Sequence, residues 1–249
     1  MQTPSDDESL DILSNRLKIL QRKKGHRATS DDVLLAWAAL EFGGSSKRML
    51  DLGTGKATVA MLTLSCRSQL SAVGVEVFPQ SVDLARRNTR LNGLDARLSI
   101  IEADLRHHHR FAKLGPFDLV TGAPPFMPIG TGLLPHDEQR ASGRFELKGG
   151  VEDYYIAAAK NITPRGSIIV LMDGAGGARN EAAAEASGLW VHNRLDVAPR
   201  PTRPATYSIT VARAYPGVRN HTQHTMRDNS GSAWSTWYQT VRRDLDLPI

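Results

Sequence analysis

The chain has 249 residues, enough for one large domain or for a domain with a small appendage. Its hydrophobic share of 41% and charged share of 23% are typical of a globular protein and exclude a disordered one. No apolar run approaches the roughly 18 to 20 residues of a membrane helix, and the acidic start is unlike a signal peptide. A single cysteine, Cys66, excludes an internal disulfide, so we expect a cytoplasmic protein with no membrane partner.

The first elements are expected before residue 45. Residues 1–16 hold an acidic cluster and are expected to form a flexible N-terminus. The run 17–22 predicts a short strand. The cluster Ser30, Asp31 and Asp32 then predicts the start of a helix, which should end at the glycine pair 43–44.

Strands and helices alternate over the rest of the chain. Strands are predicted at 49–52, 72–77, 98–102, 117–121 and 167–172, and helices at 81–91, 151–161 and 180–187. This alternation predicts an α/β fold, a Rossmann-like, mostly parallel sheet of seven strands with helices on both faces. Prolines between 195–197 and 207–212 favour a closing antiparallel pair at one sheet edge. We expect this domain to span 17–215. An extension at 216–249 should pack on it, with a polar stretch at 220–232 and a final helix at 233–245.

A glycine loop lies at the end of the first parallel strand. Asp51, Gly53 and Gly55 match the start of a nucleotide-binding loop, in which missing side chains let the backbone approach a ligand. The position usually given to a third glycine is Ala57, which argues against a nicotinamide dehydrogenase. Alternatively, Asp51 only caps the following helix.

Two further acids end the next strands. Glu76 follows the loop by about 20 to 25 residues, the spacing at which an acid accepts hydrogen bonds from ribose hydroxyls. Asp104 follows the third strand and can bond the amino group of an adenine ring. Taken singly, Glu76 is better explained as a solvated strand end and Asp104 as the start of a turn. Three acidic strand ends in succession favour a nucleoside site at one edge of the sheet.

Four segments have the order and spacing of a known family. They are 21–27 with Gln21, Gly25, His26 and Arg27, then 32–35, then the loop 51–55, and the motif Pro124-Pro125-Phe126. Over residues 17–211 the chain resembles class I methyltransferases of the small-domain type, most of all bacterial enzymes that methylate adenine N6 in valine tRNA. The resemblance implies S-adenosylmethionine as cofactor, held by the loop, Glu76 and Asp104. It implies RNA, in particular tRNA, as partner.

One residue departs from the family motif. The resemblance implies Asn-Pro-Pro-aromatic after the fourth strand, where the asparagine and a backbone carbonyl hold the amine that is methylated. Here Ala123 takes the asparagine's place, so the candidate catalytic residues are Ala123, Pro124, Pro125 and Phe126. The change removes a side-chain acceptor from the point where the amine is positioned. The Ala123 and Pro124 carbonyls can still accept, and Phe126 is either a stacking platform or a core aromatic.

Basic residues supply candidate contacts to substrate. The segment 127–150, with Arg140 and Arg144, is the candidate acceptor loop, although both arginines can instead pair with neighbouring carboxylates. Arg27 belongs to a basic cluster at 22–27 that can grip phosphate, neutralise the donor's carboxylate or form a solvated turn. The net charge of +5 fits a nucleic-acid partner and an ordinary basic surface equally well.

The predicted function is S-adenosylmethionine-dependent N-methylation of an RNA base such as tRNA adenine N6. Two alternatives stay open. Ala123 makes a protein or small-molecule acceptor credible, and a donor-binding pseudoenzyme is also compatible with the sequence. No metal site is expected at His107, His108 and His109, because consecutive side chains point in different directions.

Overall fold

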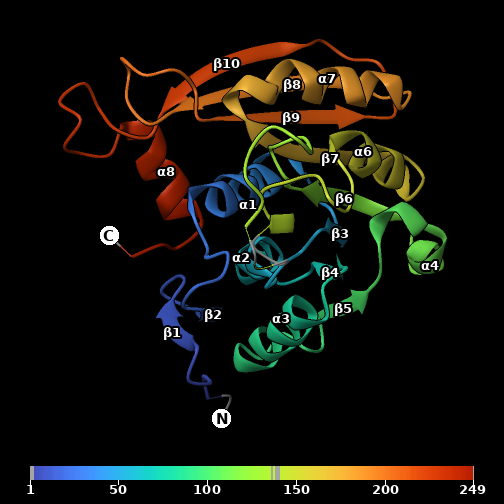
Figure 1. Ribbon diagram of the computed structural model, residues 1–249. Helices are drawn as coiled ribbons and strands as arrows, with labels where there is room; N and C mark the ends of the chain where they lie inside the picture. Colours follow the sequence, from blue (N-terminus) through green and yellow to red (C-terminus); the bar gives the residue numbers. More distant parts are fainter. Residues whose placement is uncertain (1–2, 136, 138–140, 249) are drawn as a thin grey trace.

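The computed structural model describes residues 3–135, 137 and 141–248 (Figure 1). Eight strands form its main sheet: β3 (Arg48–Leu52), β4 (Ser71–Glu76), β5 (Leu98–Glu102), β6 (Phe117–Gly122), β7 (Ile162–Asp173), β8 (Trp190–Ala198), β9 (Tyr207–Arg213) and β10 (Asn220–Thr225). Their spatial order is β10-β8-β9-β7-β6-β3-β4-β5. Within these described strands, β9 alone runs antiparallel to its neighbours. The predicted Rossmann-like, mostly parallel sheet is confirmed.

Helices cover both faces of the sheet: α1 (Ser30–Phe42), α2 (Thr58–Cys66), α3 (Pro79–Leu91), α4 (His109–Ala112), α6 (Val151–Ala159), α7 (Gly177–Ala186) and α8 (Thr236–Asp244), with 3-10 turns η1 (Leu105–His107) and η2 (Gly174–Gly176). The apolar residues of α1, α2, α3 and α8 share one buried cluster, and those of α4, α6 and α7 share the other. Successive strand residues alternate between the clusters, Met49 with the first and Leu50 with the second, because strand side chains point to opposite faces.

Helix α1 begins and ends where its sequence predicts. Thr29 is the N-cap and forms a capping box with Asp32, whose carboxylate accepts the Thr29 N–H at 3.2 Å. The helix ends at Gly43. Trp37 packs edge-on against Trp237 of α8 with ring centroids 5.3 Å apart, which fixes the C-terminal helix on the domain.

The sheet has one strand more than predicted. The polar stretch at 220–232 was not expected to form a strand, but its first six residues are β10, which pairs parallel to β8. The predicted antiparallel pair of β8 and β9 exists, yet β10 lies outside it at the sheet edge (Figure 1). The His221 ring nitrogen Nε2 lies 2.8 Å from Asp196 Oδ2 of β8, and Arg219 pairs with Glu181 of α7. Side-chain pairing therefore attaches a strand that has no apolar pattern of its own.

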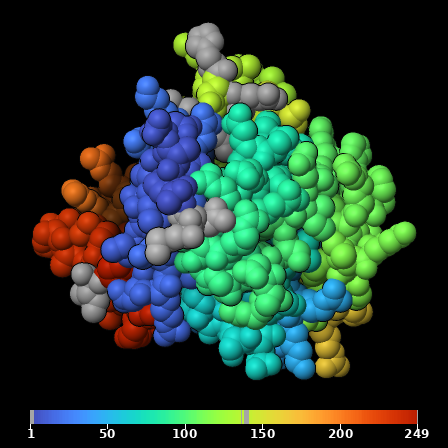
Figure 2. All heavy atoms as spheres, turned by 90° about the horizontal axis from the view of Figure 1, so that it is seen from below, coloured from blue at the N-terminus to red at the C-terminus, as the bar shows by residue number. Residues whose placement is uncertain are grey.

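The N-terminal segment also differs from the prediction. Within the supposedly flexible residues 1–16, β1 (Glu8–Ile12) forms a strand that pairs antiparallel with β2 (Lys18–Arg22). The hairpin packs against α3 and lies between that helix and the red C-terminal segment (Figure 2).

Two asparagines, Asn88 of α3 and Asn92 at its C-cap, bond to the free edge of β2. The Asn88 amide accepts the Leu20 N–H at 2.7 Å and donates to the Leu20 carbonyl at 3.1 Å. Asn92 makes the same pair of bonds with Lys18 at 2.9 and 2.8 Å. Because the two residues are one helical turn apart, they present amide groups to the strand as a neighbouring strand would.

Candidate active site

A cavity of about 960 Å³, including its open mouth, lies where β3, β4, β5 and β6 end. The carboxyl ends of parallel strands are where ligands of open α/β sheets bind. Six of the sequence-predicted site residues line it: Gly53, Gly55, Glu76, Asp104, Ala123 and Pro125. The fold therefore brings together residues that are up to 72 positions apart in the chain, between Gly53 and Pro125.

The glycine loop is bound to the neighbouring strand by its own backbone. Gly53 and Gly55 have φ angles of 64° and 56°, a region that favours glycine. The Thr54 N–H donates to the Val75 carbonyl at 3.0 Å. A methyl group on Gly55 would meet no atom within 4 Å, whereas one on Gly53 would overlap the Tyr154 hydroxyl. Gly55 thus leaves its side of the loop open.

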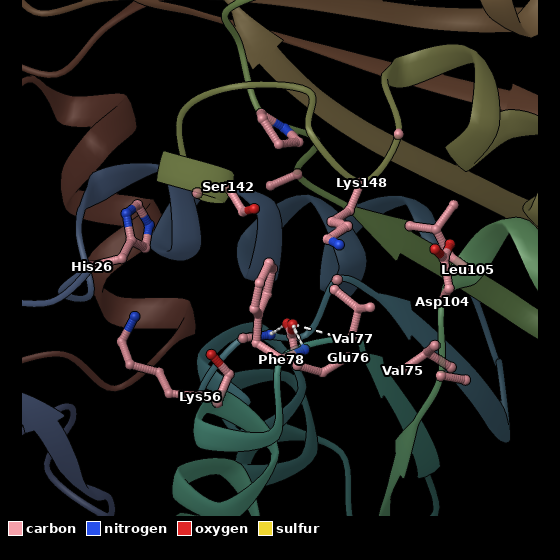
Figure 3. A pocket seen from close by; sticks show the side chains of 18 of the residues that line it. His26, Lys56, Val75, Glu76, Val77, Phe78, Asp104, Leu105, Ser142 and Lys148 are labelled. Carbon is pink, nitrogen blue, oxygen red and sulfur yellow. Dashed lines mark hydrogen bonds between the residues drawn. The ribbon is translucent and has the colours of Figure 1, made fainter. Parts of the chain in front are cut away.

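Glu76 is buried at the cavity wall and accepts three backbone hydrogen bonds (Figure 3). Its Oε1 accepts the Val77 and Phe78 N–H groups, and its Oε2 accepts the Gly55 N–H, all at 2.9 Å. Burial nevertheless raises the pKa of this carboxyl above its usual value. A carboxylate has about four acceptor positions, so one remains on Oε2 for a ligand in the cavity.

Asp51 lies behind the loop and does not line the cavity. Its carboxylate is 2% exposed and accepts the Thr54 and Thr121 hydroxyls, both at 2.6 Å. Burial raises its pKa to about 6. The structure therefore gives Asp51 a place at the junction of the loop with β6, where it fixes the loop's position.

Asp104 lines the cavity and also starts a turn. It is the N-cap of η1, where Oδ1 accepts the Arg106 N–H at 2.9 Å. The Arg106 guanidinium donates to both oxygens, with Nη2 2.6 Å from Oδ2, and this pairing lowers the pKa of Asp104. Arg106 thus holds the carboxylate ionised and fixed in orientation beside the cavity.

The four motif residues after β6 divide between cavity and core. Ala123 and Pro125 line the cavity, whereas Pro124 is buried. Phe126 is half-buried and packs against both hydrophobic clusters, and it is not part of the cavity wall. Its position is that of a core aromatic.

The predicted substrate arginines lie away from the cavity wall. Arg27 donates to Asp11 at 2.8 Å and to the Ser9 hydroxyl at 3.0 Å, both on β1. Arg144 is exposed outside the cavity, and Arg140 lies outside the described residues. The segment 127–150 still contributes to the cavity wall, through Ser142, Gly143, Lys148 and Gly149.

Sequence reasoning missed several cavity residues. Lys56 directly follows Gly55, so its place in the sequence could have revealed it, whereas Tyr154 comes from a distant segment. Lys148, also in the wall, lies within the predicted acceptor segment 127–150. The Tyr154 ring also covers Gly122, where a methyl group would lie 2.6 Å from its Cδ1. Two glycines at the ends of β3 and β6 therefore make room for this ring.

No group of three His, Cys, Asp or Glu side chains in the described part of the chain is arranged to hold a metal ion. Among the described helices, none is both long enough and apolar enough to cross a membrane. In the histidine run 107–109, where no metal site was expected, the His108 ring nitrogen Nε2 lies 3.1 Å from Lys160 Nζ.

The chain is similar to known methyltransferases in sequence and in fold. Residues 31–131 match the methyltransferase small domain family. The chain is 30% identical to a tRNA1(Val) (adenine(37)-N6)-methyltransferase of Porphyromonas gingivalis, over 65% of this chain and 64% of that protein. It is 32% identical to a release factor glutamine methyltransferase of Rhodospirillum rubrum, over 59% and 46%. A predicted O-methyltransferase from Agrobacterium tumefaciens superposes with a TM-score of 0.65 at 18% identity, covering 88% and 98%.

These matches confirm the predicted resemblance and the fold of S-adenosylmethionine-dependent methyltransferases. The chain spans less than two thirds of the length of the two curated relatives.

Proposed function

We propose that this chain binds S-adenosylmethionine in the cavity and transfers its methyl group to a nitrogen of an RNA base, with adenine N6 of a tRNA as the acceptor. The observation that carries the proposal is the Glu76 carboxylate at the cavity wall. Three backbone N–H groups fix it, and one acceptor position remains for a ligand hydroxyl. A tRNA acceptor agrees with the cytoplasmic location that the sequence predicts.

The residues around Glu76 suit the adenosine part of the donor. Asp104 offers a second carboxylate at the same wall, and Val77 and Leu105 offer apolar contacts to a flat ring. Gly55 leaves the loop backbone open to close approach. When bound, S-adenosylmethionine supplies a methyl group activated by a sulfonium.

The acceptor side rests on backbone groups. Transfer to nitrogen is an in-line displacement, so the protein has to align the amine and accept hydrogen bonds from its N–H groups. Ala123 lies at the cavity wall without a polar side chain, and its carbonyl and that of Pro124 are the remaining candidate acceptors. The tRNA adenine methyltransferase of P. gingivalis supports RNA as the acceptor.

A transfer assay separates the possible acceptors. The protein is incubated with S-adenosylmethionine labelled in its methyl group and with separate pools of RNA, protein and metabolites. We expect label in RNA, at adenine N6. Label in protein alone would reject the RNA acceptor in favour of the class of the R. rubrum relative, and label in metabolites alone would reject it in favour of a small molecule. Donor binding without label in any pool would identify a pseudoenzyme.

The donor site is tested separately by calorimetry. Glu76→Gln keeps the side chain's size but loses the charged acceptor, so we expect S-adenosylmethionine affinity to fall by about 10- to 100-fold. The matched control is Glu102→Gln, an exposed acid paired with Glu76 on the neighbouring strand, which should leave affinity unchanged. Equal affinities for wild type and Glu76→Gln would remove the main support for the donor site.

A further inference from the structure

Charge is distributed unevenly around the cavity. Figure 3 shows Glu76 and Asp104 towards one side, Lys56 and His26 on the other, and the Phe78 ring between them. One half of the cavity therefore holds both carboxylates, with Lys148 above Glu76 in this view, and the other half is suited to an anion. The proposed function accounts for the acidic half and leaves the basic half without a role.

Lys56 is the buried cation of the basic half. Its side chain is 7% exposed, and its only ion pair among the described residues is with Asp32, at an Nζ–Oδ2 distance of 4.0 Å. That distance is too long for a hydrogen bond. No other described group is within hydrogen-bond distance of Nζ. The Lys56 nitrogen is not among the described atoms that are fully buried without a partner, so it is open to the cavity that its side chain lines. An ammonium on a largely buried side chain, with no close acceptor, indicates a site that an anionic ligand completes.

Both members of this loose pair are held in place by other contacts. The Asp32 carboxylate accepts the Thr29 N–H as part of the capping box of α1. The Lys56 carbonyl accepts a hydrogen bond from the buried Asn88 amide at 3.1 Å. Asp32 is thus committed to the helix start, and Asn88 fixes the backbone from which the Lys56 side chain extends.

We propose that Lys56 binds the carboxylate of the amino-acid part of S-adenosylmethionine, an inference that rests on the proposed function. The donor has hydroxyl and amine groups at its adenosine end and a carboxylate at its amino-acid end. With the adenosine beside Glu76 and Asp104, the carboxylate extends to the basic half of the cavity. An RNA phosphate is the poorer candidate, because a side chain that is 7% exposed lies beyond the reach of a bulky polyanion.

Two ligands that differ in the amino-acid part test the proposal. S-adenosylhomocysteine carries the carboxylate, whereas 5′-methylthioadenosine has the same adenosine and thioether without it. Both are titrated by calorimetry into wild type and into Lys56→Met, which keeps the length of the side chain and removes its charge. We expect Lys56→Met to weaken S-adenosylhomocysteine by about 10- to 100-fold and 5′-methylthioadenosine by less than about twofold.

Two further variants distinguish the loss of the Lys56 charge from a general disturbance of the cavity. Lys148→Met changes the other lysine of the cavity wall and should leave the ratio of the two affinities unchanged. Lys56→Arg keeps the charge and should recover part of the S-adenosylhomocysteine affinity. Equal weakening of both ligands by Lys56→Met, or no weakening of either, overturns the proposal. If wild type binds neither ligand, the donor site itself is rejected along with the proposed function.

Discussion

The packing of Tyr154 on the glycine loop predicts a measurable coupling between two substitutions. In Gly53→Ala the new methyl group would overlap the Tyr154 hydroxyl, and the φ of 64° would become unfavourable. The left-handed backbone contributes about 1–2 kcal/mol and the overlap about 1–3 kcal/mol. We therefore expect the free energy of unfolding to fall by roughly 2–5 kcal/mol in this variant.

Removing the hydroxyl should restore the part of this loss that comes from overlap. In Gly53→Ala with Tyr154→Phe, the nearest ring atom to the new methyl group is Cζ at 3.2 Å, a close contact that small shifts relieve. Only the backbone term of about 1–2 kcal/mol should remain. Urea denaturation of wild type, both single variants and the double variant measures the coupling.

Gly55→Ala is the matched control for this cycle. Its φ is 56°, but its methyl group would meet nothing within 4 Å, so it should show the backbone loss and no coupling to Tyr154→Phe. If the loss in the Gly53→Ala, Tyr154→Phe protein equals the sum of the two single losses, the overlap is not what destabilises Gly53→Ala.

Two other predictions concern Asp51 and Ala123. Burial raises the folded-state pKa of Asp51 from 3.8 to about 6, so its stabilising contribution is complete below pH 3.8 and is lost as the pH rises to about 6, a change of about 3 kcal/mol. Asp51→Asn cannot titrate, and the unfolding free energy of wild type relative to this variant should therefore fall between pH 4 and pH 6 in urea titrations; a constant difference would contradict the assigned burial effect. Ala123→Asn restores the missing side-chain acceptor and should raise methylation of adenine in the labelled-donor assay by about tenfold or more. If labelling does not rise, the acceptor is held by other groups.

Local sequence pattern predicted the apolar strands of the sheet, including the edge strand β5, and failed on the polar strand β10. The strands β3 to β7 are apolar because both faces are covered, so composition alone reveals them. β10 is polar, and its attachment depends on His221 and Arg219 contacting other elements. In the N-terminal hairpin the strand β2 was predicted, whereas β1 was missed, because β1 depends on pairing with β2 and on the ion pair of Glu8 with Arg87 of α3. Such tertiary pairing leaves no periodic signal in the segment that it orders.

The site shows the same division between local and distant contacts. Glu76 was predictable because an acid at a strand's carboxyl end faces the ligand edge of the sheet. The inward orientation of Asp51 was not, since it depends on Thr121, 70 positions later. Tyr154 was missed for the same reason, because its role follows from contact with Gly53 on a distant segment. Arg106 lies only two residues after Asp104, so its contact is local, but it belongs to no motif.

Ala57 explains why an incomplete glycine motif still gives the loop its shape. It is the N-cap of α2 with a φ of 70°, the left-handed conformation that a third glycine would adopt without strain. An alanine there is disfavoured by about 1–2 kcal/mol. Its methyl group, however, is fully buried in the first hydrophobic cluster, and burial of one such group contributes about 0.8 kcal/mol. Glycine would lack that burial and would lose more chain entropy on folding, so the two residues are close in energy. Ala57 therefore leaves the loop's geometry intact. Counted from Gly53, the third glycine of the dinucleotide fingerprint falls on Thr58, so the departure that argues against a dinucleotide site is at Thr58.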